Sequence, residues 1–449
     1  MKSATAIKSI ISSSVGNVLE WYEYTLYAYF ATVISTLFFP QDNHFIAMLM
    51  TFATFTVGLA ARPIGGIIFG YIGDKFSRKK MLTVTMLLMS IPTMCIGLLP
   101  TYAEIGIFAP ILLVTLRILQ GIALGGEFGA SCVYLYESVP ENKRGFYGTL
   151  ALTGVGTGLV LSAFTILMVE SFISQEAIYA YAWRIPFFVS VIGSGLAFYM
   201  RLNLLESRDF EIARADNQLV RNPFMQMMKE HKLTLLRLFG IFLTTQVSFF
   251  VIFIFGKTMM IDFLHFDPRV AGKFNLLTVI SYTLSTLVFG YLSDKFDKRY
   301  IILIGVMLMF LSAYPFIMSL ESGNAIYILM MSLLFGALIG MTEGTLNPLV
   351  ASSFPTNIRA TSVAFCWNFT SVAFGGISPM IAMWLNDRFG SIEAVGFYLM
   401  GVCFLSLISL VTMIKPKVIL SQRRWQGSAG TGSGDSSSEI IDLKPHGAD

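Results

Sequence analysis

Seven ionisable side chains stand inside long apolar runs of this sequence, where a charge is costly. They are Glu20, Glu23, Arg62, Arg117, Glu127, Lys257 and Glu343. A charged group at the centre of a membrane-spanning helix costs about 2.5–3.5 kcal/mol even on the most favourable scale, so each needs a partner or a water-filled cavity. A carboxylate balanced between desolvation and a nearby cation can take up and release a proton. These residues therefore indicate proton exchange and recognition of a charged solute within a membrane.

Two of these carboxylates share one face of a helix. Glu20, Glu23, Tyr24 and Tyr27 occupy positions i, i+3, i+4 and i+7, which lie together along one side. We expect the pair of Glu20 and Glu23 to couple transport to protons, with no preference between the two. The alternative is that Glu20 lies at the inner water boundary and only ties helices together.

A second polar stripe lies on the fourth apolar run, where Arg117, Gln120 and Glu127 stand at i, i+3 and i+10. Glycines surround Glu127 and permit close approach of another helix. We hypothesise that Arg117 is a fixed cation and that proton uptake by a carboxylate loosens its pairing, with Glu127 a coupling candidate and Gln120 a candidate substrate contact. A permanent ion pair that only holds the helices together is the alternative.

Three further charged residues are candidate substrate contacts. Arg62 falls at a depth similar to that of Glu20, and is either a ligand for a substrate carboxylate or an ion-pair partner. Lys257 is the only charge we assign to the seventh run, where it either faces a cavity or extends its ammonium group outward. Glu343 occupies the position in the second half of the chain that Glu127 occupies in the first.

Aromatic side chains make up 14% of the chain, so most of them must face lipid or pack in the interior. Trp21, Tyr24, Tyr27, Trp367 and Asn368 are more specific, because they lie near the polar candidates of the first and eleventh runs. The face of an aromatic ring attracts a quaternary ammonium group. These residues are therefore candidate substrate contacts, and ordinary packing is the alternative.

The elements that must position these residues are membrane-spanning helices. Hydrophobic residues form 55% of the chain, charged residues only 13%, and the mean hydropathy is +0.69. These values exclude a water-soluble domain. We predict an all-α membrane protein with twelve spans, at 11–38, 46–72, 81–99, 107–138, 145–170, 185–204, 236–262, 268–293, 300–319, 326–350, 360–385 and 393–414.

The basic residues of the loops predict the orientation. With the N-terminus inside, the outer loops hold only Arg184, Arg269, Lys273 and Arg388, and all other loop lysines and arginines lie inside. We therefore expect a multi-pass protein of the bacterial inner membrane with both termini in the cytoplasm. The first apolar run lacks a cleavage site with small residues, so we expect it to be a retained helix.

The chain contains an internal repeat. GYIGDKFSRKK follows the second span, and GYLSDKFDKRY follows the eighth. Pro140 with Arg144 corresponds to Pro355 with Arg359. A six-span repeat is typical of transporters that rock two bundles around a central site. We predict a first bundle over 1–204, a cytoplasmic linker over 205–235, a second bundle over 236–415, and a disordered tail over 416–449.

The repeated loops also carry candidate latch residues. Asp74 with Arg78 and Asp294 with Lys298 or Arg299 are expected to form cytoplasmic salt bridges. Such bridges would stabilise the outward-facing state, and we expect them to affect turnover rather than substrate choice.

Twelve spans, a central linker and the duplicated loop resemble the major facilitator superfamily, whose fold is two six-helix bundles. Finer motifs resemble its metabolite–proton symporter branch: GNVLEWYEY, RPIGG, RILQGIALGGEFG, WRIPF and FPTNIR. That resemblance implies import of proline and betaine, or of 2-oxoglutarate, citrate or shikimate, together with protons. The chain departs from the branch at Glu23, where Asp is usual, and at Arg208, where Pro is frequent.

The expected function is proton symport of a small polar solute, most of all a zwitterion such as proline or glycine betaine. A carboxylate symporter is the alternative, followed by an efflux pump, a channel or a membrane sensor. We expect no enzyme activity, no metal and no cofactor, because no metal cluster and no nucleophile with a nearby base is visible. The expected partners are the solute, protons and the lipid bilayer, with no nucleic acid, and the monomer is expected to be functional.

Overall fold

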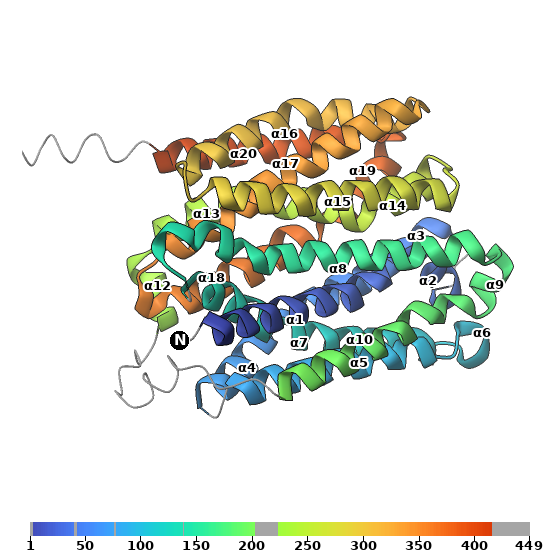
Figure 1. The fold of residues 1–449 in the computed structure, drawn as a ribbon. Helices are drawn as coiled ribbons and strands as arrows, with labels where there is room; N and C mark the ends of the chain where they lie inside the picture. The colour runs from blue at the N-terminus through green and yellow to red at the C-terminus, as the bar shows by residue number, and fades with distance from the viewer. Residues whose placement is uncertain (1–2, 40–42, 76–77, 138, 203–222, 415–449) are drawn as a thin grey trace, which may run out of the picture.

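The structure, a computed structural model, describes residues 3–39, 43–75, 78–137, 139–202 and 223–414, nearly all of them helical (Figure 1). The first half contains α1 (Ser3–Tyr29), α2 (Ala31–Phe38), α3 (His44–Ala60), α4 (Arg62–Lys75), α5 (Arg78–Leu98), α6 (Tyr102–Ile105), α7 (Phe108–Glu137), η1 (Glu141–Lys143), α8 (Arg144–Phe172), α9 (Gln175–Ala180), η2 (Ala182–Arg184) and α10 (Ile185–Leu202). The second half contains α12 (Pro223–Glu230), α13 (Lys232–Phe249), η3 (Phe250–Phe255), α14 (Gly256–Thr258), η4 (Met259–Phe263), α15 (Pro268–Leu292), α16 (Lys298–Glu321), α17 (Ala325–Ser352), α18 (Thr356–Thr370), η5 (Ser371–Gly376), α19 (Ser378–Phe389) and α20 (Glu393–Ile414).

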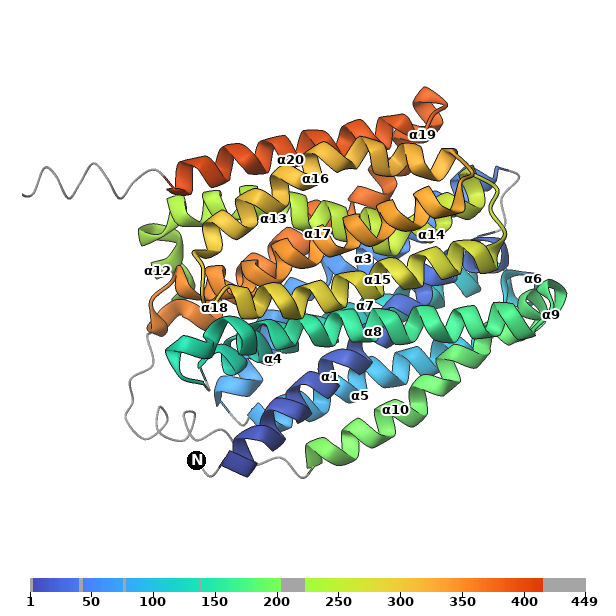
Figure 2. The same cartoon turned by 45° about the horizontal axis from the view of Figure 1, so that its top comes forward.

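The predicted all-α membrane architecture is confirmed. Within the described ranges, eight helical stretches are by themselves long and apolar enough to cross a bilayer. The other predicted spans correspond to α1 with α2, to α5, to α10, and to α18 with α19. We call each helical stretch that corresponds to a predicted span a rod. The rods run side by side, and α1 starts at the same end of the molecule at which α20 stops (Figures 1 and 2). We call this end the terminal end and the opposite one the distal end.

The rods form two groups that follow the two halves of the chain. In the first, α7 packs against α3, α4, α5 and α8, and α1 packs against α8 and α10. In the second, α17 packs against α15 and α16, and α20 packs against α13 and α16. The groups meet where α15 lies along α8, and where α18 and α19 lie along α7 and α3. The helices that carry the interior charges therefore belong to two bundles that pack against each other.

The boundaries between the predicted domains are only partly described. The linker, 205–235, is described from 223 onward, where α12 and the start of α13 lie, and the tail, 416–449, lies outside the described residues. The seventh rod begins at Lys232 rather than at 236. Its basic residues extend the helix into the polar boundary, since long cationic side chains keep their charged ends in water there.

Short polar side chains define several helix starts. Asn43, Asp267, Asp297 and Asn324 each accept a hydrogen bond from a backbone N–H in the first turn of α3, α15, α16 and α17, respectively. Such caps satisfy donors that the helix itself leaves unpaired. They position the rods that carry the interior charges.

Glycines bring α7 against α3 and α4. A side chain on Gly121 would meet the backbone carbonyl of Gly58, and one on Gly125 would meet the backbone of Arg62. Gly65 lies in the same way against the carbonyl of Ile122. Because only small residues permit this approach, the glycines bring the rods that carry Arg62 and Arg117 together.

Three stretches of the second half are wound as π-helix: η3, η4 and η5. η3 and η5 pack against each other, and η3 also packs against α1 of the other bundle. π-helical turns are rare and occur frequently at functional sites. The irregular backbone is therefore concentrated where the two bundles meet.

We expect Gly121→Ala to lower the amount of folded protein and its apparent Tm, because the new methyl group collides with the Gly58 carbonyl. Size-exclusion chromatography and thermal unfolding in detergent measure both effects. Gly401→Ala is the matched control, since nothing lies within 4 Å of the position of its added methyl group. Equal behaviour of the two variants would contradict the packing argument.

Candidate functional site

Arg117 of α7 is fully buried and is solvated by the protein itself. Its guanidinium carbon lies 4.2 Å from the Tyr24 ring centroid, 4.6 Å from that of Tyr27 and 5.2 Å from that of Phe55. One terminal nitrogen, Nη1, donates to Gln120 Oε1 at 2.8 Å and to the Tyr24 carbonyl at 3.4 Å. The other two nitrogens, Nε and Nη2, have no hydrogen-bond partner. Unsatisfied buried donors are costly, so Arg117 is suited to receive an anion.

Glu23 of α1 lies among hydroxyl groups. Its carboxylate accepts hydrogen bonds from Thr93 at 3.0 Å, from Ser90 at 3.4 Å and from Ser194. No described carboxylate lies within ion-pair distance of Arg117, so the direct pairing that we hypothesised for it is not formed there. The side chain of Glu127, the other coupling candidate, lies outside the described residues.

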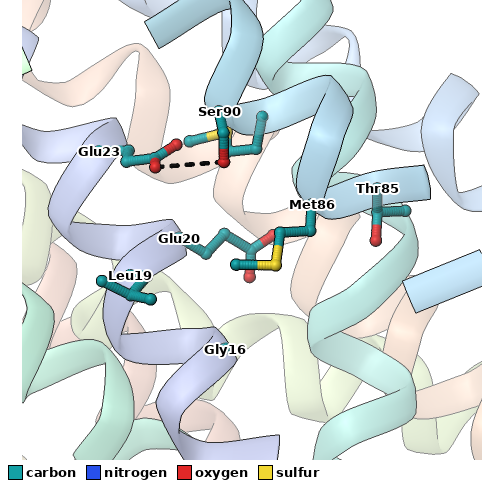
Figure 3. A pocket seen from close by; sticks show the side chains of 8 residues that line it. Gly16, Leu19, Glu20, Glu23, Thr85, Met86 and Ser90 are labelled. Atoms are coloured by element: carbon teal, nitrogen blue, oxygen red, sulfur yellow. Dashed lines mark hydrogen bonds between the residues drawn. The ribbon is translucent and has the colours of Figure 1, made fainter. Parts of the chain in front are cut away.

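Glu20 and Glu23 line one small pocket between α1 and α5, with a volume of about 10 Å³ (Figure 3). That volume admits roughly one water molecule. The predicted shared face of the two carboxylates is therefore present. Arg62 is buried at the start of α4, within electrostatic range of Glu20 and Tyr24. Its Nε and Nη1 have no hydrogen-bond partner.

Aromatic rings connect the two bundles beside Arg117. The Trp21 ring lies 6.1 Å from the Tyr24 ring and 5.6 Å from the Phe249 ring of the second bundle. Phe55 of α3 lies 5.0 Å from Tyr24 and 6.0 Å from Phe250. The ring faces that attract a quaternary ammonium group are thus next to a guanidinium that can receive a carboxylate.

Glu343 is buried in α17, and it accepts a hydrogen bond of 2.6 Å from the Tyr282 hydroxyl. The Tyr282 ring lies 5.9 Å from Phe249 and 4.9 Å from Phe253. Phe249 also contacts Trp21, so one series of rings extends from the Arg117 side to the Glu343 side. The series of rings therefore has a cation at one end and a carboxylate at the other.

Trp367 and Asn368 do not contact this series of rings in the described structure; they bind other helices. Trp367 Nε1 donates to Asn347 Oδ1 at 3.3 Å, and its ring packs against Phe128 and Phe242. Asn368 Nδ2 donates to the Gly125 carbonyl at 3.2 Å. Both residues tie α18 to neighbouring helices, so the structure favours their packing role over the predicted substrate contact.

A family model described as Major Facilitator Superfamily matches residues 21–376. The chain belongs to the Major Facilitator Superfamily. This facilitator is 31% identical over 416 residues to the proline/betaine transporter of Salmonella typhimurium. The matched region covers 90% of this chain and 83% of that protein. It is 34% identical over 412 residues to the inner membrane metabolite transport protein YhjE of Escherichia coli, at 90% and 93% coverage.

The shikimate transporter of Escherichia coli is 31% identical to the facilitator over 413 residues, at 91% and 94% coverage. Among solved structures, a D-xylose–proton symporter superposes with a TM-score of 0.73 at 17% identity, covering 92% of this chain and 98% of that one. The partially occluded inward-open xylose transporter XylE of Escherichia coli gives 0.75 at 16% identity, with 93% and 99% covered. These superpositions confirm the predicted major facilitator fold.

Lys257 ties the two bundles of the facilitator together near the distal end. Its Nζ lies 2.6 Å from Glu170 Oε1 of α8 and 3.4 Å from the Tyr29 carbonyl, and both charged side chains are buried. Lys257 thus does not extend outward, which was one of the two alternatives left open by the sequence. Glu170 was missed, although it stands at the edge of the fifth apolar run, because only its partner's position reveals its role.

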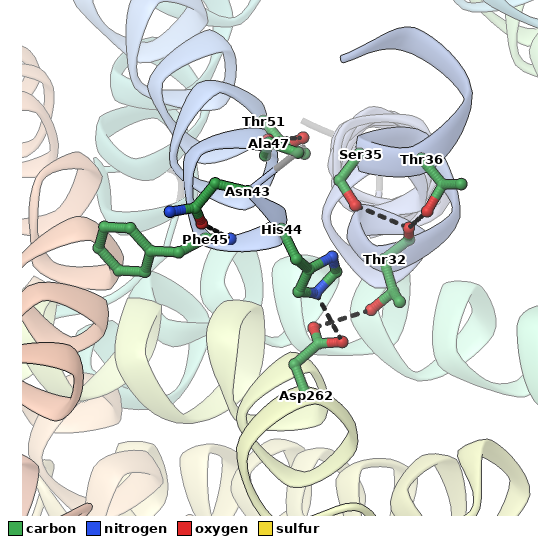
Figure 4. Close-up of polar contacts among 9 residues, drawn as sticks. All are labelled: Thr32, Ser35, Thr36, Asn43, His44, Phe45, Ala47, Thr51 and Asp262. Carbon is green, nitrogen blue, oxygen red and sulfur yellow. Dashed lines mark hydrogen bonds and ion pairs between the residues drawn. The ribbon is translucent and has the colours of Figure 1, made fainter. Parts of the chain in front are cut away.

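A second contact between polar side chains joins the bundles at the same end (Figure 4). Asp262 of η4 lies 3.4 Å from His44 Nε2 of α3 and accepts a hydrogen bond from Thr32 at 3.2 Å. His44 and Thr32 belong to the first bundle, and Asp262 belongs to the second. Asp262 was missed because it falls on the predicted boundary of the seventh span.

The latch residues of the terminal end bind differently from the prediction. Asp294 accepts the backbone N–H groups of Gly145 at 2.5 Å and Phe146 at 3.0 Å, at the start of α8. Arg299 pairs with Asp297 at 2.5 Å instead of with Asp294. The positive end of a helix and its unpaired N–H groups attract the Asp294 carboxylate. The side chains of Asp74 and Arg78 lie outside the described residues, and Lys298 forms no described salt bridge.

We expect Glu170→Gln or Lys257→Met alone to lower the apparent Tm clearly, because removal of one partner from a buried ion pair costs about 3–5 kcal/mol. The double variant should recover most of the loss, since neither charge is left unpaired. Thermal unfolding of the purified protein in detergent measures this coupling.

Lys273→Gln is the control, because Lys273 is an exposed lysine of the neighbouring helix α15. Single variants with the Tm of this control would show that the ion pair is not a stabilising contact.

Proposed function

We propose that this facilitator is a proton-coupled symporter that imports a small zwitterion such as proline or glycine betaine. The observation that carries the proposal is the pair of unpartnered Arg117 donors beside aromatic rings from both bundles. Two parallel N–H donors fit a carboxylate, and ring faces fit an ammonium group. The similarity to proline/betaine transporters supports the same substrate class.

Glu23 is the proposed site of proton binding. It faces hydroxyl donors in the interior, and the pocket that it shares with Glu20 extends from it along α1 toward the terminal end. A protein-lined pocket with room for about one water molecule suits a short path for proton release. Glu127 remains the second coupling candidate.

The two ends supply the closures that alternating access requires. Distally, Lys257 binds Glu170 and Asp262 binds His44 across the bundles. At the terminal end, Asp294 binds the start of α8, and Asn347 Nδ2 donates to the Gly148 carbonyl at 2.5 Å. The described contacts thus join the bundles on both sides of the central residues. Rocking of the bundles would break one set while it keeps the other.

We assign the terminal end to the cytoplasm and the protein to the bacterial inner membrane. The distribution of basic residues supports this orientation. Asp294, and by its repeat position Asp74, act as latch residues in this scheme. The proton gradient drives transport, no cofactor is required, and the monomer holds the complete site.

A carboxylate substrate is the second candidate. Arg62 and Arg117 are both buried cations with unpartnered donors, and the shikimate transporter is a relative of similar identity. Such an anion would use both arginines and would not need the aromatic faces. The choice of substrate therefore distinguishes the two candidates.

Liposomes that contain the purified protein and an internal pH dye test the function directly. We expect proline or glycine betaine to acidify the lumen when added outside, whereas 2-oxoglutarate, shikimate or citrate would do so if the second candidate is correct. No acidification by any of the five, with correctly folded protein, would contradict proton symport of both substrate classes.

We expect Glu23→Gln to abolish proton-driven accumulation and to preserve substrate exchange across the liposome membrane, because the amide keeps the size of the side chain but takes up no proton. Glu321→Gln, at an exposed carboxylate at the end of α16, should transport as the wild type does. Full accumulation by the Glu23 variant would remove this residue from the coupling mechanism, and Glu127→Gln tests the other candidate in the same assay.

A further inference from the structure

A chain of hydrogen bonds connects Arg117 to Glu23 through two uncharged side chains. Arg117 Nη1 donates to Gln120 Oε1 at 2.8 Å, and Gln120 Nε2 donates to Thr93 Oγ1 at 2.7 Å. Thr93 Oγ1 in turn donates to Glu23 Oε2 at 3.0 Å. The exposed fraction of all four residues is 1% or less, so these bonds are shielded from bulk water. The chain joins α7, α5 and α1.

The direction of this chain is set by its two ends. A guanidinium only donates and an ionised carboxylate only accepts, so the amide and the hydroxyl between them must each accept from the Arg117 side and donate toward Glu23. Hydrogen bonds aligned in one direction polarise one another and gain strength inside a protein. The cation and the carboxylate therefore interact without direct contact.

Thr93 is the member of this hydrogen-bond chain whose hydroxyl can donate to either of two acceptors. Its hydroxyl carries one proton, and two acceptors lie within reach: Glu23 Oε2 at 3.0 Å and the Met89 carbonyl at 2.8 Å. A charged acceptor forms the stronger hydrogen bond, so the ionised Glu23 holds the proton of the hydroxyl. When Glu23 is protonated this advantage is lost, and the Met89 carbonyl becomes the preferred acceptor.

We propose that Thr93, together with Gln120, is a positioning residue that transmits the protonation state of Glu23 to Arg117. The inference rests on the proposed function. Protonation of Glu23 turns the Thr93 hydroxyl to Met89 and removes the negative end of the chain. Arg117 then loses a distant counter-charge and binds a substrate carboxylate more tightly. By linkage, bound substrate favours the protonated Glu23 to the same extent.

Other ionisable groups lie near the hydrogen-bond chain from Arg117 to Glu23. Glu20 lines the pocket of Glu23, and Arg62 lies within electrostatic range of Glu20. Tyr22 lies within electrostatic range of Glu23. Among the described residues of α5 and α10, the groups that bind Glu23 are the hydroxyls of Ser90, Thr93 and Ser194, which do not titrate near neutral pH. Of these three hydroxyls, Thr93 is the one that the described hydrogen bonds also join to Gln120.

The first test needs no substrate. Infrared difference spectroscopy of the protein in lipid nanodiscs follows the carboxyl band of Glu23 against pH, with Glu23→Gln to assign the band. We expect Thr93→Val and Gln120→Leu to shift the midpoint in the same direction, by about tenfold in proton concentration for Thr93→Val. Thr93→Ser keeps the hydroxyl and should restore the wild-type midpoint. Thr115→Val, at an exposed threonine of α7, is the control for the substitution itself.

Gln120 is decisive, because it binds Thr93 and Arg117 and forms no hydrogen bond to Glu23. If the Glu23 carboxyl band has its wild-type midpoint in Gln120→Leu, the proposed transmission is wrong, even if Thr93→Val shifts that midpoint. A Thr93→Ser variant that behaves as Thr93→Val would show that Thr93 acts through packing alone, and would overturn it as well.

The second test uses labelled glycine betaine as the probe. In liposomes, Thr93→Val should accumulate several-fold less glycine betaine under a proton gradient, relative to its own rate of exchange, and Thr93→Ser should accumulate it normally. Wild-type-like accumulation by Thr93→Val would contradict the inference. Absence of accumulation by the wild type itself would instead contradict the proposed function, and the spectroscopic result would still decide the role of Thr93.

Discussion

A guanidinium buried inside a bundle of helices must be solvated by protein groups, and much of the interior follows from how this is done for Arg117. Three ring faces, one amide and one backbone carbonyl surround it. Among the described residues, no carboxylate belongs to this shell. Glycines at the contact of α7 with α3 and α4 allow the backbones close enough for the shell to form.

The two ends of the molecule are closed by different physical means. The distal contacts join side chains: the buried ion pair of Lys257 with Glu170, and the contact of His44 with Asp262. The described terminal contacts depend mainly on backbone groups, such as the N–H groups that bind Asp294 and the Gly148 carbonyl that binds Asn347. Charged pairs lose strength sharply when water enters between them, whereas bonds to a helix end depend on exact placement of the helix. The two closures therefore respond to different perturbations.

Much of the fold was predictable from the sequence, because the length and apolarity of a span are local properties. The shared face of Glu20 and Glu23 was equally predictable, since it depends only on helical spacing. The partners of Lys257 and Asp294 were not, because they depend on how whole helices are rotated and placed against each other. Periodicity shows that residues share a face, but it does not show which helix that face meets. Trp367 illustrates this limit. The sequence pattern of the eleventh span suggests a place beside the polar candidates, yet the ring packs against Phe128 and Phe242.

The π-helical winding around Lys257 gives the distal closure a further property. A π-turn contains one more residue than an α-turn, so η3 and η4 on either side of Lys257 hold surplus backbone. If one of these turns tightens to an α-turn, the residues beyond it rotate by about 100° around the helix axis. The Lys257 ammonium would thereby turn away from Glu170. Such a change in winding would release the contact of Lys257 with Glu170 at the distal end.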